Sequence, residues 1–199
     1  MKYINQLEHK DIPYITKTDT PEEPRGKETT FSSSGCGLAS AIMVADRLLI
    51  DPELTLEDAV QLSYSCGANH ATGTDYKIFA PVFAEKFGLK LEVSEDPERL
   101  RYCLRTGGAA VIYCSVGDGY AAVFTKGGHY VVAICEAEDG RIVILDPSYT
   151  DTKFDTPERR DKVEIRPAGK RNVVLCDIQV LVEDTMAVKP ECFYLFWRK

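Results

Sequence analysis

The spacing of apolar residues changes about half-way along the chain. Before residue 108, apolar residues recur three and four positions apart, which is the period of a helix with one buried face. This part of the sequence predicts four helices, at about residues 36–49, 55–63, 75–88 and 96–107. A short strand is expected between the last two helices, at residues 89–93.

Polar residues at the predicted helix starts support this assignment. Thr55-Leu56-Glu57-Asp58 has the form of a capping box, in which two polar side chains each bind the other's backbone N–H. Asp96 stands in the N-cap position of the fourth helix, with Pro97 in the first helical position. Gly88 follows the third helix, where glycine commonly ends a helix.

From residue 109 onward the apolar residues fall in short runs rich in Val, Ile, Tyr and Phe, which are typical of strands. Strands are predicted at residues 109–116, 129–136, 141–146, 173–182 and 193–198. Glu138-Asp139-Gly140 is a hairpin turn, so the strands on either side of it should be antiparallel neighbours.

Helices followed by strands, without alternation of the two, predict a single α+β domain over residues 1–199. Residues 1–34 are polar and contain three prolines, so we expect an extended segment there, with a short edge strand at residues 12–15. Residues 35–107 form the predicted helical half and residues 108–199 the sheet half. The helix that begins at residue 36 is expected to pack on the antiparallel sheet.

Composition narrows the class of protein. Hydrophobic residues make up 44% of the 199 residues, which is ordinary for a globular fold, and the net charge is −7. An acidic chain with scattered Lys and Arg does not predict a nucleic-acid or membrane partner. The N-terminus lacks the apolar run of a signal peptide, so we expect a cytoplasmic protein; a secreted protein given without its signal is the alternative.

Seven cysteines, odd in number and without a Cys-x-x-Cys pair, predict reduced thiols; no metal site and no cofactor are predicted. Cys36 differs from the other cysteines because it lies between two glycines at a predicted helix start. Unpaired backbone N–H groups and the positive end of the helix dipole favour a thiolate there. We therefore predict a nucleophile, with a buried structural thiol as the alternative.

The chain has three histidines, of which His129 is the predicted base for this thiolate. It follows Gly127-Gly128 and opens an apolar strand, so its imidazole should face a cleft at the edge of the sheet. Asp146 ends the next predicted strand, and an antiparallel return brings it to the same end of the sheet, where it can orient the imidazole. The alternatives are a histidine that only caps a strand and an aspartate that only opens a turn before Pro147.

The order of these motifs resembles the papain-like cysteine peptidases: Gly-Cys-Gly at a helix start, Gly-Gly-His at a strand start, then Asp-Pro. More narrowly, it is similar to the peptidase family C-thirty-nine-like group, relatives of the bacteriocin-processing double-glycine peptidases. The resemblance covers about residues 12–150, and the apolar residues 192–196 also fit. It implies a papain-like fold and peptide-bond hydrolysis through an acyl-thioester. Cys36 would be the nucleophile, His129 the general base and then acid, and Asp146 the orienting residue.

One position departs from the family's pattern. Family members carry a glutamine upstream of the cysteine, and its side-chain amide donates to the oxyanion. Here no glutamine lies between Gln6 and Cys36, and Lys17 occupies the corresponding position. We predict Lys17 and the Cys36 backbone N–H as oxyanion donors, with a displaced Gln6 as the alternative. Losing one donor costs about 2.7–4 kcal/mol in the transition state, so weak activity is expected.

Small residues near the motifs predict the substrate cleft. Gly35 and Gly37 flank the cysteine and Gly128 precedes the histidine, so each should leave room for a substrate. His70 lies in a loop of small residues, 66–74, that would form a wall of the cleft; an ordinary solvent-exposed loop is the alternative.

Together these residues predict a hydrolase that cleaves a peptide or an isopeptide-like amide with a Cys-His-Asp triad. The expected partner is a peptide or protein substrate, and the oligomeric state is not predicted. Transfer of the acyl group to an amine instead of water is a variant of the same chemistry. The alternative from another class is a catalytically impaired protein that binds peptides or a partner protein through the same cleft, which the missing glutamine favours.

Overall fold

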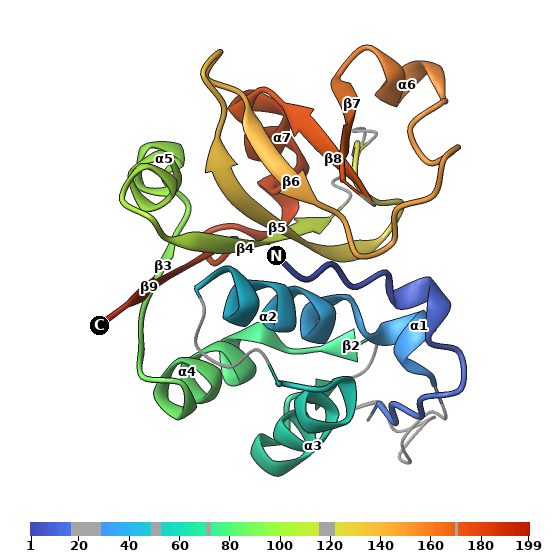
Figure 1. The fold of residues 1–199 in the computed structure, drawn as a ribbon, viewed down its shortest axis with the longest axis vertical. Coiled ribbons are helices and arrows are strands. Elements are labelled where there is room, and N and C mark those ends of the chain that lie inside the picture. The colour runs from blue at the N-terminus through green and yellow to red at the C-terminus, as the bar shows by residue number, and fades with distance from the viewer. Residues whose placement is uncertain (17–28, 49–52, 71–72, 116–121, 170) are drawn as a thin grey trace.

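N-terminal helices pack on a seven-stranded antiparallel C-terminal sheet, in the α+β arrangement that the sequence predicts (Figure 1). The structure is a computed structural model that describes residues 1–16, 29–48, 53–70, 73–115, 122–169 and 171–199. The chain forms most of its helices first and then most of its sheet, so the helix that carries Cys36 and the strand that carries His129 come from different layers.

Helices form where a polar cap precedes a periodic apolar run. The four predicted helices are α2 (Cys36–Arg47), α3 (Leu56–Cys66), α4 (Tyr76–Lys86) and α5 (Pro97–Arg105). Shorter helices are η1 (Gln6–Glu8), α1 (Phe31–Ser34), α6 (Pro157–Arg160), α7 (Ile178–Asp184) and η2 (Met186–Val188). The capping box before α3 is confirmed: the Thr55 hydroxyl accepts from the Asp58 N–H at 3.0 Å, and the Asp58 carboxylate accepts from the Thr55 N–H at 3.1 Å.

The main sheet contains all the predicted strands except the short one at residues 12–15, and it also contains one strand, β7, that was not predicted. Its strands are β3 (Leu89–Ser94), β4 (Ala109–Ser115), β5 (Gly128–Glu136), β6 (Ile142–Leu145), β7 (Val163–Ala168), β8 (Arg171–Cys176) and β9 (Phe193–Arg198). They lie in the order β3-β9-β4-β5-β6-β8-β7, and all neighbouring pairs are antiparallel. The turn predicted between β5 and β6 is present, with Gly140 at φ +82°. Two short strands, β1 (Asn69–His70) and β2 (Gly73–Thr74), pair apart from this sheet.

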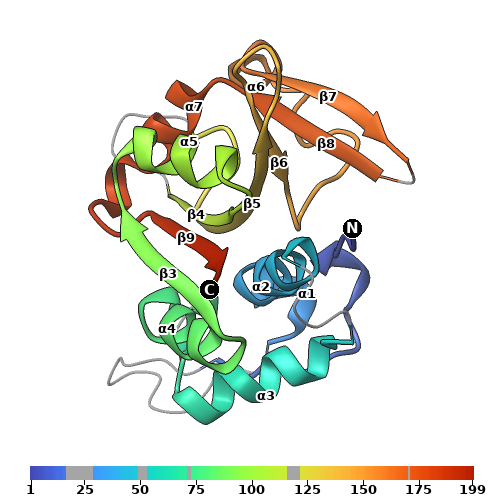
Figure 2. The same ribbon diagram turned by 60° about the vertical axis from the view of Figure 1, so that its left-hand side comes forward.

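Alternate residues of the sheet face two different layers of helices. Ala109 and Val111 of β4 belong to a core shared with α2, α3 and α4, whereas Ala110 and Ile112 belong to a second core shared with α5 and α7. Figures 1 and 2 show the first three helices on one side of the sheet and the other two on the opposite side. Helix α2 packs on β4 and β5 at the centre of the sheet.

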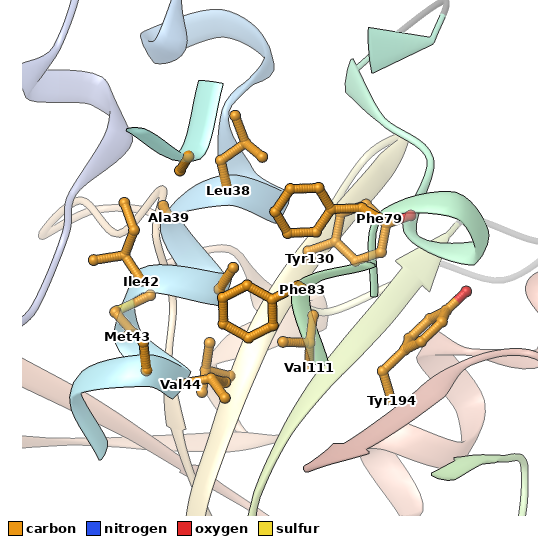
Figure 3. Close-up of a cluster of buried hydrophobic side chains, with 14 of the residues drawn as sticks. Leu38, Ala39, Ile42, Met43, Val44, Phe79, Phe83, Val111, Tyr130 and Tyr194 are labelled. Atoms are coloured by element: carbon orange, nitrogen blue, oxygen red, sulfur yellow. The ribbon is translucent and has the colours of Figure 1, made fainter. Parts of the chain in front are cut away.

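The first of these cores holds α2 against the sheet. Leu38, Ile42 and Met43 of α2 are almost fully buried, and Figure 3 shows them grouped with Phe79 and Phe83 of α4 and with side chains of the sheet. Full burial of each such side chain contributes roughly 1.5–3 kcal/mol. The N-terminal end of α2 therefore has a fixed place relative to β5.

The first 34 residues are not wholly the extended segment that the sequence predicts. The Asn5 side chain accepts a backbone N–H hydrogen bond at 3.1 Å and starts η1, and Thr30 stands in the N-cap position of α1. In place of an edge strand at residues 12–15 there is an isolated antiparallel bridge between Pro13 and Thr30. Local polar capping outweighs the extended tendency that the prolines suggest.

The strand predicted at residues 173–182 is wrong in its second half. β8 ends at Cys176, and Asp177 precedes α7, whose buried residues lie on one side of a helix. A continuous apolar run does not by itself distinguish a strand from a buried helix. The unpredicted β7 is an edge strand whose alternate residues include exposed charged side chains, such as Glu164 and Arg166, so its sequence looks polar.

The strand predicted at residues 89–93 is present as β3, but it does not belong to the helical layer. It lies at the edge of the main sheet and pairs with β9, with Leu89 opposite Arg198. This pairing joins segments that are about a hundred residues apart in the sequence, which a local pattern cannot reveal.

Candidate active site

Cys36 is the first residue of α2, directly after the short helix α1. The first hydrogen bond within α2 runs from the Ala39 N–H to the Gly35 carbonyl at 2.9 Å. The N–H groups of Cys36 and Gly37 therefore have no partner within α2, and they lie at the positive end of its dipole. Cys36 is partly buried, and it lines the cleft described below.

Gly35 and Gly37 were predicted to line the cleft, but they do not; they allow close packing instead. A Cβ on Gly35 would lie 2.5 Å from the Phe31 carbonyl oxygen, and one on Gly37 would lie 3.0 Å from the Thr74 Cβ. Both positions face the protein interior, which leaves no room for a side chain. The glycines thus allow α1 and β2 to approach the start of α2 closely.

The structure brings His129 and Asp146 together. His129 lies at the beginning of β5 and Asp146 directly follows β6, and the His129 Nε2 is 2.8 Å from the Asp146 Oδ1. Because an ionised carboxylate only accepts hydrogen bonds, Nε2 carries the proton. The other ring nitrogen, Nδ1, is left for Cys36, whose side chain is hydrogen-bonded to His129. All three predicted triad residues are therefore in one connected chain.

Contacts around the sulfur favour its thiolate. Burial alone would raise the pKa of the Cys36 thiol, but the hydrogen bond and charge of His129 outweigh it, with further help from the Tyr130 and Gly37 N–H groups. The pKa of Cys36 is consequently below its usual value. Burial would also lower the pKa of His129, but the Asp146 carboxylate and Cys36 raise it above its usual value. Both shifts are in the direction that favours the thiolate and the imidazolium.

Two residues that the sequence analysis did not identify complete the surroundings of Asp146. The Lys153 Nζ is 2.5 Å from the Asp146 Oδ2 and 2.7 Å from the Ser148 Oγ. The Ser148 N–H donates to the Asp146 Oδ1 at 2.9 Å, and its Oγ lies 3.1 Å from the His129 Nε2. The serine two residues after an aspartate is a recognisable turn signal. Lys153 had no signal, because its position depends on the path of the turn.

Gln6 contacts α1, the short helix that precedes α2. Its side chain is buried, and its Nε2 donates to the Ser32 carbonyl at 2.8 Å. Within the described part of the chain, the buried Gln6 Oε1 has no hydrogen-bond partner. Lys17, the predicted oxyanion donor, lies outside the described residues.

A cleft of about 450 Å³ opens on Cys36. His70 and Gly128 both line it. Aromatic side chains from the sheet form one wall, where the Tyr113 ring stacks on Tyr130 with centroids 4.5 Å apart. The remaining lining residues are Gly73, Thr74, Asp75, Lys77, Ala187, Val188, Lys189, Glu191 and Tyr194. The cleft gives an extended ligand direct access to the sulfur.

Among the residues that the structure describes, no cluster of three or more His, Cys, Asp or Glu side chains is arranged to hold a metal ion. None of the described helices has the length and the apolar composition that a membrane span requires. Comparison of the sequence with protein-family models gives no match, and comparison with curated proteins gives none either.

Proposed function

We propose that the protein is a cysteine hydrolase of papain-like fold that cleaves a peptide or an isopeptide-like amide through a thioester intermediate. The observation that carries this proposal is the connected chain Cys36–His129–Asp146, whose first member lines an open cleft while the other two lie buried behind it. A nucleophile, a base and a group that orients the base are the parts that acyl transfer needs. The order of the three motifs along the chain, which resembles the C-thirty-nine-like peptidases, agrees with it.

In the proposed reaction the Cys36 sulfur attacks the substrate carbonyl carbon, and the electron pair of the carbonyl bond moves to its oxygen. The His129 Nδ1 proton passes to the leaving nitrogen as the C–N bond breaks, which leaves a thioester on Cys36. His129 then takes a proton from water, the water oxygen attacks the thioester carbon, and the C–S bond breaks. An amine in place of water would give acyl transfer by the same steps.

Gln6 is the proposed side-chain donor to the oxyanion, in place of Lys17. Its amide is buried, and its nitrogen donates to the carbonyl of Ser32 in α1, the short helix that precedes α2. A preorganised amide dipole stabilises a developing oxyanion without reorganising during the reaction. With Gln6 in this role, the argument for a catalytically impaired protein loses its main support.

Brief treatment with limiting iodoacetamide at about pH 6, followed by site-resolved mass spectrometry, tests the thiolate. Cys36 should react about tenfold faster than the other six thiols, because only a thiolate is alkylated and the pKa of Cys36 is lowered. His129→Ala should remove this preference, since the imidazolium stabilises the thiolate. The matched control His9→Ala removes a histidine outside the triad and should leave the preference intact.

The proposal fails if Cys36 of the native protein reacts no faster than the other thiols. In that case the cleft would be a binding surface, and peptide binding without turnover would become the function to test. If Cys36 is selectively alkylated, screening with peptide libraries should supply a substrate.

A further inference from the structure

The carboxylate of Asp146 is divided between two cationic partners. Its Oδ1 faces the His129 Nε2 at 2.8 Å, and its Oδ2 faces the Lys153 Nζ at 2.5 Å. Lys153 is only 11% exposed and the Asp146 side chain is fully buried, so this ion pair is largely shielded from water. The Ser148 Oγ accepts a further hydrogen bond from Lys153 and lies beside the same imidazole nitrogen.

Hydrolysis by a thiolate and an imidazolium does not by itself require a lysine here. With the thiolate and imidazolium formed, Cys36, His129 and Asp146 carry a net charge of −1, and Lys153 makes the buried cluster neutral. A buried carboxylate with His129 as its sole partner would hold the imidazolium proton more strongly than one whose charge is shared. His129 has to release that proton to the leaving amine.

Other titratable groups face this cluster from neighbouring elements. Cys114 of β4 is close to Asp146 and to Asp184 of α7, and the Tyr3 hydroxyl donates to the Asp146 carbonyl at 2.6 Å. Burial raises the pKa of both Cys114 and Tyr3, so both stay neutral at physiological pH. The Asp184 carboxylate accepts the Val123 and Phe124 N–H groups at 2.9 and 2.8 Å. Among the described residues, Lys153 and His129 are therefore the two cations that pair with Asp146.

We infer that Lys153 is a positioning residue of this site: its ammonium holds the Asp146 carboxylate toward His129 and offsets part of its charge, so that the imidazolium can give up its proton. The inference rests on the proposed hydrolase function. It is distinct from the triad chemistry, because Lys153 acts only through Asp146 and Ser148.

Removing a positive charge raises the pKa of every group nearby. In Lys153→Met the pH at which Cys36 alkylation reaches half its maximum should therefore rise, by about one unit. Lys153→Arg retains the charge and should keep the native midpoint. Lys162→Met is the matched control, since it removes a lysine that pairs with Glu183 on the surface at 3.5 Å, and it should also keep the native midpoint.

Alkylation of Cys36 is measured from pH 4 to pH 9 on the native protein and the three variants, with thermal unfolding as the check of folding. A midpoint that shifts in Lys153→Met and stays native in Lys153→Arg and Lys162→Met supports the inference. An unchanged midpoint with Cys36 still selectively alkylated overturns it and leaves the hydrolase proposal standing, whereas loss of selectivity in the native protein overturns the hydrolase proposal itself. If Lys153→Met does not fold, Lys153→Gln replaces it. Failure of both to fold makes Lys153 a structural residue and overturns the inference.

Discussion

At the scale of single residues, the protein places chemically identical thiols in opposite electrostatic surroundings. Burial raises the pKa of five of the other cysteines: Cys103 (to about 12), Cys114, Cys135, Cys176 and Cys192. At Cys36 burial acts in the same direction, but the neighbouring imidazole and backbone N–H groups outweigh it. Reactivity is therefore decided by the partners of a thiol and not by its burial alone.

Gln6→Ala should separate stabilisation of the oxyanion from stabilisation of the Cys36 thiolate. Turnover of a substrate found by library screening should fall about 10²–10³-fold, because one oxyanion donor is lost. Alkylation of Cys36 forms no oxyanion, so its rate at pH 6 should stay within about twofold of native. Gln61→Ala, at an exposed position on α3, is the control and should change neither. Equal loss of turnover and alkylation would show that Gln6 only maintains the structure.

At the scale of elements, residues 3–6 tie the segment after β6 to the helical layer. The Asn5 Nδ2 donates to the Tyr149 carbonyl at 3.0 Å, and the Gln6 N–H donates to the Pro147 carbonyl at 2.7 Å. The Gln6 side chain in turn reaches α1 through Ser32. Residues 3–6 thus bind both the segment that carries Asp146 and the short helix that precedes α2.

Tyr3→Phe tests this attachment, because it removes only the hydroxyl that donates to the Asp146 carbonyl at 2.6 Å. The free energy of unfolding should fall by about 1 kcal/mol, the usual worth of a partly buried hydrogen bond. Urea denaturation measures it. Tyr102→Phe is the control: its side chain is 52% exposed, and the unfolding free energy should change by less than about 0.5 kcal/mol. Equal effects in the two variants would contradict the prediction.

Elements with strong local signals could be predicted from the sequence, and elements set by distant contacts could not. Asp96 and the capping box at Thr55 locate two helix starts, and both are confirmed. The helix α7 and the edge strand β7 were missed because neither has a local pattern that distinguishes it. At the site, the motifs at Cys36, His129 and Asp146 predicted residues that do come together. Lys153 lacked such a motif, because only the folded turn brings it to the carboxylate.

At the scale of the whole molecule, the buried site links stability to pH. Burial would raise the pKa of Asp146, but Lys153 and His129 hold it well below its usual range. Its ionised form therefore stabilises the folded protein above the unfolded-state pKa of about 3.9, and this stabilisation is lost as the pH falls through the lower folded-state value. Exposed carboxylates with lowered pKa values, such as Glu164 at about 2, act in the same direction.

Below about pH 4, the free energy of unfolding should accordingly change less steeply with pH in Asp146→Asn than in the native protein. Each proton taken up on unfolding changes this free energy by about 1.4 kcal/mol per pH unit, and the variant lacks the proton that Asp146 takes up. Calorimetric unfolding between pH 5 and pH 2.5 measures the two slopes. The variant will be less stable overall, because Lys153 loses its buried partner, so the slope and not the level is diagnostic. Parallel slopes would mean that Asp146 is not ionised in the folded state.

The place of β9 in the sheet has a consequence for the order of folding during synthesis. β9 follows every other described element in the sequence, yet it lies between β3 and β4. Until residues 193–198 have left the ribosome, β3 cannot join the sheet, and the edge of β4 that β9 covers stays unpaired. Because translation adds residues one at a time at roughly 5–20 per second, the nascent chain exposes a bare strand edge for seconds. The strand that closes the sheet is the last of the described strands to be made.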